Sequence, residues 1–400
     1  MRLDPDAIEL PAKWVWKKLK YVSQLGAGDA ITADEIAEEG PYPVYGGNGL
    51  RGYTSNFNRS GAVVLIGRQG ALCGNVNYAS GDYWASEHAI VVDPQGKCVV
   101  GWLGELLRSM NLNQYSQSAA QPGIAVDNIA SLELPVPPVE VQSKISSFLD
   151  SETAEIDTLI EAKQKLLGLL AEKRRTLVAE AVMRGLDRSA PLRPSGIDWL
   201  GDIPAHWEVR RLATLFTEKD ERNEPDLPLL EVSINTGVSV RQFSTTQIEG
   251  TAADFNTYKV ARKGSLAFNK MRMWQGAVGV TPTDGLISPD YVVAEPSHEI
   301  DAAFAGLLFR TAAFSAECAR NSVGITWDRL RLYWDGFRDI SIGLPPLDEQ
   351  RQISQRIGTE ASKIDKLATA TERSITLLKE RRSALIAAAV TGQIAIPEAA

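Results

Sequence analysis

Glycine-rich turns carrying amide, guanidinium and aromatic side chains are the segments of this sequence best suited to binding chemistry. Three of them fall in the first quarter of the chain, and their candidate side chains are Asn48, Arg51, Tyr53, Arg68, Asn75 and Asn77. Glycine allows backbone to approach a partner closely, and Arg and Asn side chains pair in a bidentate manner with the edges of nucleobases. We therefore predict that these turns contact nucleic acid.

A second cluster of the same residue types occurs in the other half of the chain. Its candidates are Asn269, Lys270, Arg272, Trp274, Gln275 and, farther along, Arg329. Arg, Asn and Gln would contact bases, whereas Lys would hold phosphate. For any single residue, a turn whose polar group is satisfied locally is an equally good interpretation. The recurrence of the cluster after a matching strand-like run favours the binding interpretation.

The motifs of several enzyme classes are absent from the sequence. There is no Gly-x-x-x-x-Gly-Lys-Ser/Thr phosphate loop, no dinucleotide-binding glycine fingerprint after a strand, and no S-adenosylmethionine motif of a methyltransferase. The histidines His88, His206 and His298 are not spaced for a metal site or a catalytic triad. Asp290 and Glu295 resemble a nuclease carboxylate pair, but the required lysine does not follow. We predict that the chain carries no catalytic residue, metal site or bound cofactor of its own.

Length and composition favour a multidomain globular protein. The 400 residues exceed one ordinary hydrophobic core, and a charged content of 23% is typical of a soluble chain. No apolar run approaches the roughly 20 residues that span a bilayer. The chain begins without a secretion signal and none of its three cysteines lies in a Cys-x-x-Cys spacing, so we expect a cytoplasmic protein with no membrane contact. With a net charge of −8, any nucleic-acid surface must come from local basic groups.

An internal repeat divides the sequence into two halves. The segment from Pro137 to Gln142 recurs as the segment from Pro345 to Gln350. In the same register, the matched pairs include Ile156 with Ile364, Asp157 with Asp365, and Arg174 with Arg382. Two shorter parallels are Pro11 to Trp14 with Pro204 to Trp207, and the run from Gly123 with the run from Gly324. Because the regions between them diverge, the layout is a variable domain and a repeated segment, twice over.

Both repeated segments are predicted to be long helices. Apolar residues recur at alternating intervals of four and three from Ile145 and from Ile353, and no proline interrupts either segment. The proline pairs upstream mark the helix starts. Neither row of apolar side chains, which we call a seam, is apolar enough to be stable alone. We therefore expect the helices to pack against each other as an antiparallel coiled coil. The alternative is that each helix docks only on its own domain. Polar interruptions in the seams leave a second surface that suits partner subunits.

Short apolar runs bounded by turn residues predict that the variable domains are rich in strands. The runs are Val63–Ile66, His88–Val92, Ser265–Phe268 and Tyr291–Ala294, while Leu103–Met110 and Ala302–Phe314 favour helix. The predicted fold class is α/β (α+β), with two mixed, strand-rich domains joined by the two long helices in a pseudo-twofold repeat. We place variable domain 1 at 1–136, helix 1 at 137–186, a linker at 187–205, variable domain 2 at 206–344, helix 2 at 345–394 and a tail at 395–400.

The linker and helix motifs resemble those of type I restriction–modification specificity (S) subunits. The phrase from Ser195 to Val209, the proline-led helices and the closing run from Ala389 to Ile394 carry this resemblance, which covers essentially the whole chain. The resemblance implies a DNA-reading subunit without catalysis of its own. Its variable domains would be target recognition domains, each reading one half of a bipartite, asymmetric site in double-stranded DNA.

The same resemblance implies a set of partners. Two methyltransferase (M) subunits, which bring S-adenosylmethionine, would dock on the helices, and the helices would set the spacer between the half-sites. Two restriction/translocase (R) subunits would join for cleavage. One alternative is a specificity subunit of a methylation-only or regulatory system without a nuclease partner. A second alternative is an enzyme with an unrecognised active site, but no set of residues in the sequence supports this interpretation. Because each variable domain holds slightly more acidic than basic residues, tight DNA binding is expected to need the M subunits.

Overall fold

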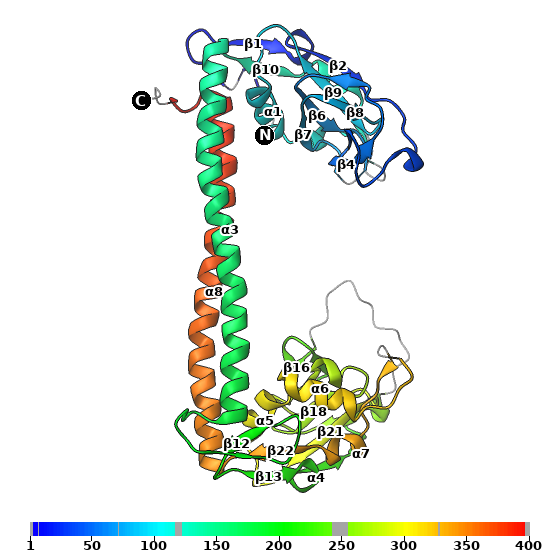
Figure 1. Cartoon of the computed structure of the whole chain (residues 1–400), viewed down its shortest axis with the longest axis vertical. Coiled ribbons are helices and arrows are strands. Elements are labelled where there is room, and N and C mark those ends of the chain that lie inside the picture. Colours follow the sequence, from blue (N-terminus) through cyan, green and yellow to red (C-terminus); the bar gives the residue numbers. More distant parts are fainter. Residues whose placement is uncertain are drawn as a thin grey trace. The chain divides into compact units, whose positions relative to one another are not determined.

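The computed structural model describes residues 3–6, 8–70, 72–116, 122–241, 255–326 and 329–396. The chain forms two compact units, Met1–Gln164 with Glu372–Ala400, and Lys165–Thr371. Each unit contains one strand-rich domain together with part of each long helix, α3 (Val139–Arg184) and α8 (Leu347–Val390) (Figure 1). Within the described residues, no helix is both long and apolar enough to cross a membrane.

The first unit is built around a four-stranded antiparallel sheet. Its strand order is β2-β9-β6-β7, where β2 is Ser23–Ala27, β9 is Ala89–Pro94, β6 is Val63–Gly67 and β7 is Val76–Ala79. One face of β6 packs with helix α1 (Val100–Ser109), and the other contributes to a core shared with a second sheet (Figure 1). Burial on both faces explains why the β6 sequence is continuously apolar rather than alternating.

The second sheet of the first unit has the order β4-β3-β8-β5. Its strands are β3 (Tyr42–Gly46), β4 (Gly49–Thr54), β5 (Arg59–Ser60) and β8 (Asp82–Ala85). Strands β3 and β4 form a hairpin, and β3 runs parallel to β8. This brings the β3–β4 turn to the end of the sheet where β8 also ends.

The second unit repeats the central sheet with the order β14-β21-β18-β19. These strands are β14 (Phe216–Lys219), β21 (Tyr291–Pro296), β18 (Leu266–Asn269) and β19 (Val278–Val280). Helices α5 (Ala302–Leu308), α6 (Ala312–Arg320) and α7 (Trp334–Asp339) contribute aromatic side chains to the core, where the rings of Phe309 and Phe314 stack at 4.5 Å. All four apolar runs predicted as strands are strands in the structure.

The remaining elements are short. The strand pairs are β1 (Val15–Lys18) with β10 (Glu133–Val136), β13 (Glu208–Arg211) with β22 (Ser341–Leu344), β11 (Leu192–Pro194) with β12 (Asp202–Pro204), β15 (Leu230–Ser233) with β16 (Gly237–Val240), and β17 (Lys259–Ala261) with β20 (Gly285–Ile287). The helices α2 (Val126–Ala130) and α4 (Leu212–Leu215) each form about one turn, as do the 3-10 helices η1 (Leu19–Tyr21), η2 (Ala33–Glu35), η3 (Leu112–Tyr115), η4 (Phe255–Thr257) and η5 (Met273–Gln275).

One backbone hydrogen bond beside the central sheet occurs at equivalent positions in both domains. It aligns the two sequences differently from the predicted match. The backbone N–H of Ile124 donates to the carbonyl of Arg68, and the N–H of Leu332 donates in the same way to Lys270, both at 2.9 Å. Leu332, rather than Ile325, is therefore the structural equivalent of Ile124. The predicted match of the Gly123 run with the Gly324 run was wrong, because it left the 208-residue spacing of the repeat, which aligns Ile124 with Leu332.

Helices α3 and α8 pack together in antiparallel orientation inside each unit. In the first unit, Arg382 Nε lies 2.9 Å from Asp157 Oδ1. In the second, Arg174 Nε lies 3.3 Å from Asp365 Oδ1. The predicted antiparallel pairing is therefore confirmed.

Each long helix is also anchored to the domain before it by a buried glutamine in its first turn. Gln142 accepts a hydrogen bond from the N–H of Val99 at 2.8 Å, next to the start of α1. Gln350 accepts one from the N–H of Asp301 at 2.7 Å, next to the start of α5. The helix starts thus dock on their own domains as well, but the alternative that each helix docks only there was wrong.

Candidate nucleic-acid interface

Two connections of the first unit that the sequence singled out come together in space with a third, which carries no predicted site residue. They are the β3–β4 turn, the β6–β7 loop and the β8–β9 turn. Asn75 Nδ2 donates to Asn48 Oδ1 at 3.2 Å, joining the first two turns. The N–H of Arg68 donates to the carbonyl of His88 at 2.9 Å, joining the last two. The fold therefore gathers polar groups from segments up to about 40 residues apart onto one end of the sheets.

Two candidates of the first unit lie outside this meeting point. Arg51 is exposed on β4, where its aliphatic stem lies close to Gly46. Tyr53 is tied to the segment before β3, because its backbone exchanges hydrogen bonds of 2.8 and 2.9 Å with Ala37. Their proposed contacts with DNA stay predictions; Arg51 lies next to the β3–β4 turn, whereas Tyr53 lies farther along β4.

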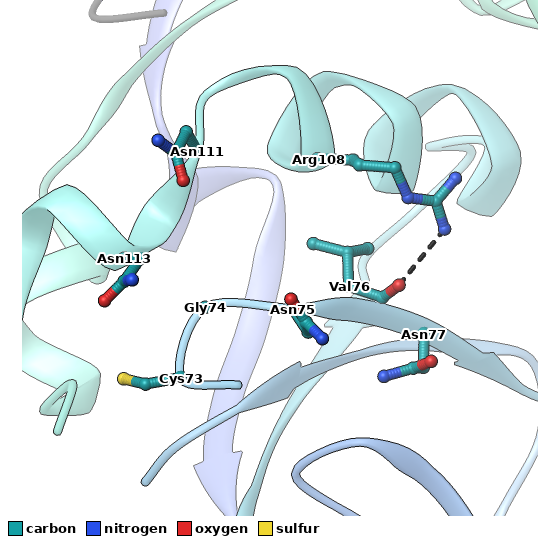
Figure 2. Close-up of a pocket in the computed structure, with 8 residues that line it drawn as sticks. All are labelled: Cys73, Gly74, Asn75, Val76, Asn77, Arg108, Asn111 and Asn113. Atoms are coloured by element: carbon teal, nitrogen blue, oxygen red, sulfur yellow. Dashed lines mark hydrogen bonds between the residues drawn. The ribbon is translucent and has the colours of Figure 1, made fainter. Parts of the chain in front are cut away.

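A cleft of about 360 Å³ opens beside the β6–β7 loop, and we call it the amide cleft (Figure 2). Its polar lining consists of Asn75, Asn77, Arg108, Asn111 and Asn113. One wall is the β6–β7 loop and the start of β7; the other is the end of α1 with η3. Gly74 makes the close approach possible, since it has φ +87° and a Cβ there would lie 2.4 Å from the Asn113 backbone nitrogen.

The single cation of the amide cleft is already neutralised. Arg108 Nη2 donates to the carbonyl of Val76 at 3.1 Å, and its guanidinium forms an ion pair with Glu105. Tyr78 donates from its hydroxyl to Glu105 at 2.9 Å, and its ring lies 5.3 Å from the Arg108 guanidinium. Burial, followed by the nearby Glu105 carboxylate, raises the pKa of Tyr78 above its ordinary value, so the phenol stays protonated.

Several amide groups of the cleft have no partner within the described residues. Asn77 Nδ2 is buried without a partner there, but this side chain lies beside Gly49, on the face of β7 that points away from α1. Asn111 begins η3 with φ +50°, yet its side chain makes no capping hydrogen bond. Sequence reasoning found Asn75 and Asn77 but missed Arg108, Asn111 and Asn113, because these lie about 30 residues onward in a helix and a turn without glycine-rich features.

In the second unit, the candidate residues lie on the β18–β19 loop, which is the counterpart of the β6–β7 loop. Asn269 ends β18 and is 9% exposed, and its Oδ1 accepts from the N–H of Met271 at 2.9 Å. Lys270 Nζ lies 3.5 Å from the carbonyl of Pro289, and Trp274 Nε1 donates to the carbonyl of Met271 at 3.0 Å. Local bonds thus hold these three side chains.

The remaining candidates of the second unit are exposed. Arg272 and Gln275 face solvent on the loop. Arg329 is exposed on the segment that returns to Lys270 through Leu332. Arg272 is the best-placed cation of this loop for an external anion or base, because within the described chain its guanidinium has no hydrogen bond or ion pair. No group of three or more His, Cys, Asp or Glu in the described parts could hold a metal ion.

Comparison with known families and sequences gives one consistent answer. The family model for the type I restriction modification DNA specificity domain matches residues 11–167. The EcoprrI type I restriction enzyme specificity subunit of Escherichia coli is 43% identical over 147 residues, which cover 36% of this chain and 36% of that subunit. The alignment thus spans about a third of the length of this curated relative.

Solved structures match over nearly the whole chain. A chain from a structural study of complex assembly and conformational transition in the type I R-M system gives a TM-score of 0.65 at 17% identity, covering 96% of this chain and 100% of that one. The crystal structure of the HsdS subunit from Thermoanaerobacter tengcongensis gives 0.55 at 16% identity, with coverages of 98% and 100%. These likenesses show a shared fold. The sequence matches show that residues 11–167 carry the type I restriction modification DNA specificity domain, and nearly the whole chain shares the fold of the solved type I R-M chains.

Proposed function

We propose that this chain is the DNA-reading subunit of a type I restriction–modification complex, with each strand-rich domain reading one half of a bipartite site in double-stranded DNA. The observation that carries the proposal is the repeated central sheet whose equivalent connections, β6–β7 and β18–β19, carry unrelated side chains. A common framework with divergent polar loops is what two readers of different sequences need.

The two half-sites should differ because the two loops offer different chemistry. The first unit offers a neutral, amide-lined cleft. The second offers an exposed arginine, Arg272, beside a half-buried tryptophan, Trp274. Amide side chains match adenine, and arginine matches guanine or phosphate. An asymmetric recognition sequence follows.

We infer that methyltransferase subunits dock on the long helices, which would also set the spacer between the half-sites. Exposed leucines occur at equivalent positions of both helices: Leu159 (45%) matches Leu367 (49%), and Leu169 (53%) matches Leu377 (54%). Large exposed apolar side chains that recur in a repeat are typical of interaction surfaces. Their duplication suits two M subunits, which would supply S-adenosylmethionine and the methyl transfer. Two R subunits would complete a restriction complex.

The chain's charge favours a shared DNA interface. With a net charge of −8, this subunit alone neutralises few phosphates, so tight binding should depend on the M subunits. Equal affinity of the isolated chain and the complex for the same DNA would contradict this part of the proposal.

The test is to express the chain with its adjacent methyltransferase subunit and to map methylated adenines by single-molecule sequencing. A bipartite, asymmetric motif that appears only with this chain is expected. Arg68→Ala should disturb one half-site and Arg272→Ala the other. Absence of a new motif from a co-purified complex would contradict the DNA-reading role.

A further inference from the structure

We propose that the amide cleft of the first unit binds the edge of one nucleobase and so determines one position of that unit's half-site. The inference rests on the proposed DNA-reading function and specifies which side chains carry it: Asn75, Asn111 and Asn113.

The charge of the cleft favours a neutral group over phosphate. Its only cation, Arg108, is already engaged by Glu105 and by the carbonyl of Val76. A phosphate would have to compete with the Glu105 carboxylate for that guanidinium. A base edge instead presents donors and acceptors without net charge, which carboxamides match with both their oxygen and their NH2 group.

The hydrogen-bonding groups of the cleft are poised for an external partner. Asn111 and Asn113 are exposed, and within the described residues their side chains have no hydrogen-bond partner. Their carboxamides are therefore accessible to a partner that enters the cleft, and each offers one acceptor and two donor hydrogens. Figure 2 shows Asn111 and Asn113 on one side of the cleft and Asn75, from the loop before β7, on the other.

The cleft is held in shape by contacts that do not use these free groups. Gly74 packs against the backbone of Asn113, and Asn75 is fixed by its hydrogen bond to Asn48. The equivalent connection of the second unit is filled by η5, whose Met273 is fully buried. The cleft therefore belongs to the first unit's chemistry and should affect its half-site alone.

The experiment uses the complex of the full chain with its methyltransferase subunits, once the methylated motif has been mapped. Affinity is measured for the motif and for each single base-pair change, at several salt concentrations. The variants are Asn75→Ala/Asn113→Ala and, as a matched control, Gln95→Ala, an exposed amide on the turn after β9.

The double variant should lose roughly tenfold discrimination at one position of one half-site, with the other half-site and the salt dependence unchanged. Unchanged discrimination at every position would overturn the inference. So would a uniform loss of affinity with a salt slope reduced by about one, which is the mark of a phosphate contact. If the double variant does not assemble, the single Asn113→Ser variant is judged by the same outcomes. A parent complex without any motif would instead refute the proposed function.

Discussion

Arg382 on α8 forms an ion pair with Asp157 on α3, with Nε 2.9 and 3.2 Å from the two carboxylate oxygens. The same residue types meet again in the second unit, where Arg174 now lies on α3 and Asp365 on α8. Both partners are shifted by 208 positions, which is the spacing of the repeat from Pro137 to Pro345. The two contacts are thus one contact related by the pseudo-twofold repeat, and they specify the antiparallel register.

The two ion pairs should contribute unequally to stability. The Arg382 side chain is 29% exposed and that of its partner Asp157 50%, whereas Arg174 and Asp365 are 51% and 60% exposed. Solvent screens the charges of the less exposed Arg382–Asp157 pair more weakly. A double-mutant cycle with Ala at both positions should therefore give a coupling energy of about 0.5–1 kcal/mol for this pair. For Arg174–Asp365 the expected coupling energy is about 0.2–0.5 kcal/mol. Urea unfolding measures both. A larger coupling for the more exposed pair would contradict this explanation.

The buried glutamines should matter more than either ion pair. Gln350 is fully buried and bonds the N–H of Asp301 and the carbonyls of Glu299 and Pro345. Gln142 makes two such bonds, to Val99 and Pro137. Since truncation leaves these backbone groups unpaired, we expect Gln350→Ala to lower the free energy of unfolding by about 3 kcal/mol and Gln142→Ala by about 2 kcal/mol.

The control for this pair is Gln355→Ala, an exposed glutamine on α8. It should change the free energy of unfolding by less than about 0.5 kcal/mol. Equal effects of all three substitutions would show that the buried bonds do not anchor the helix starts.

Local sequence features predicted the framework but only part of the site. The proline pairs and the heptad spacing placed α3 and α8 within two to four residues of their ends, and runs such as Val63–Ile66 indicated buried strands. These features are local, because periodicity and helix starts depend on near neighbours. The roles of the candidate site residues stay predictions.

The rest of the site depends on contacts between distant segments. Asn113 and Asn75 line the same cleft because Gly74 lets the β6–β7 loop approach the backbone of Asn113 closely. Leu332, not Ile325, matches Ile124 because a backbone bond sets that position. The first relationship leaves no mark in the side-chain pattern, whereas the second follows from the 208-residue spacing of the repeat, which the match of the two glycine runs did not keep.

The cysteines predict a specific response to pH. Burial raises the pKa of Cys98 to about 11, and it also raises the pKa of Cys73 and of Cys318. A thiol with a raised pKa holds its proton more tightly when folded. It therefore contributes stability that is fully present below its ordinary value of 9.0 and is lost as the pH rises through about 11.

Alkylation by iodoacetamide checks this prediction cysteine by cysteine. At pH 8, Cys98 of the folded protein should react about a hundredfold more slowly than in urea, because its thiolate fraction is lower by that factor. Stability should be flat from pH 7 to 8 and should decline above pH 9. Equal alkylation rates in folded and unfolded protein would contradict the raised pKa.

The exposed leucines of the helices predict how many methyltransferase subunits bind. Leu159 and Leu377 belong to the first unit, and Leu169 and Leu367 to the second. Substitution of both leucines of one unit by Ser should weaken the docking of one M subunit by roughly a hundredfold or more, since each buried leucine contributes about 1.5–3 kcal/mol. The complex should then purify with one M subunit per chain, and the four-fold variant with none. Because these side chains are exposed in the isolated chain, its melting temperature should not fall.

The control is Leu192→Ser, which changes an equally exposed leucine on β11. This variant should leave two M subunits bound. Loss of M subunits from this control, or their retention in the four-fold variant, would show that the leucines do not form the docking surface.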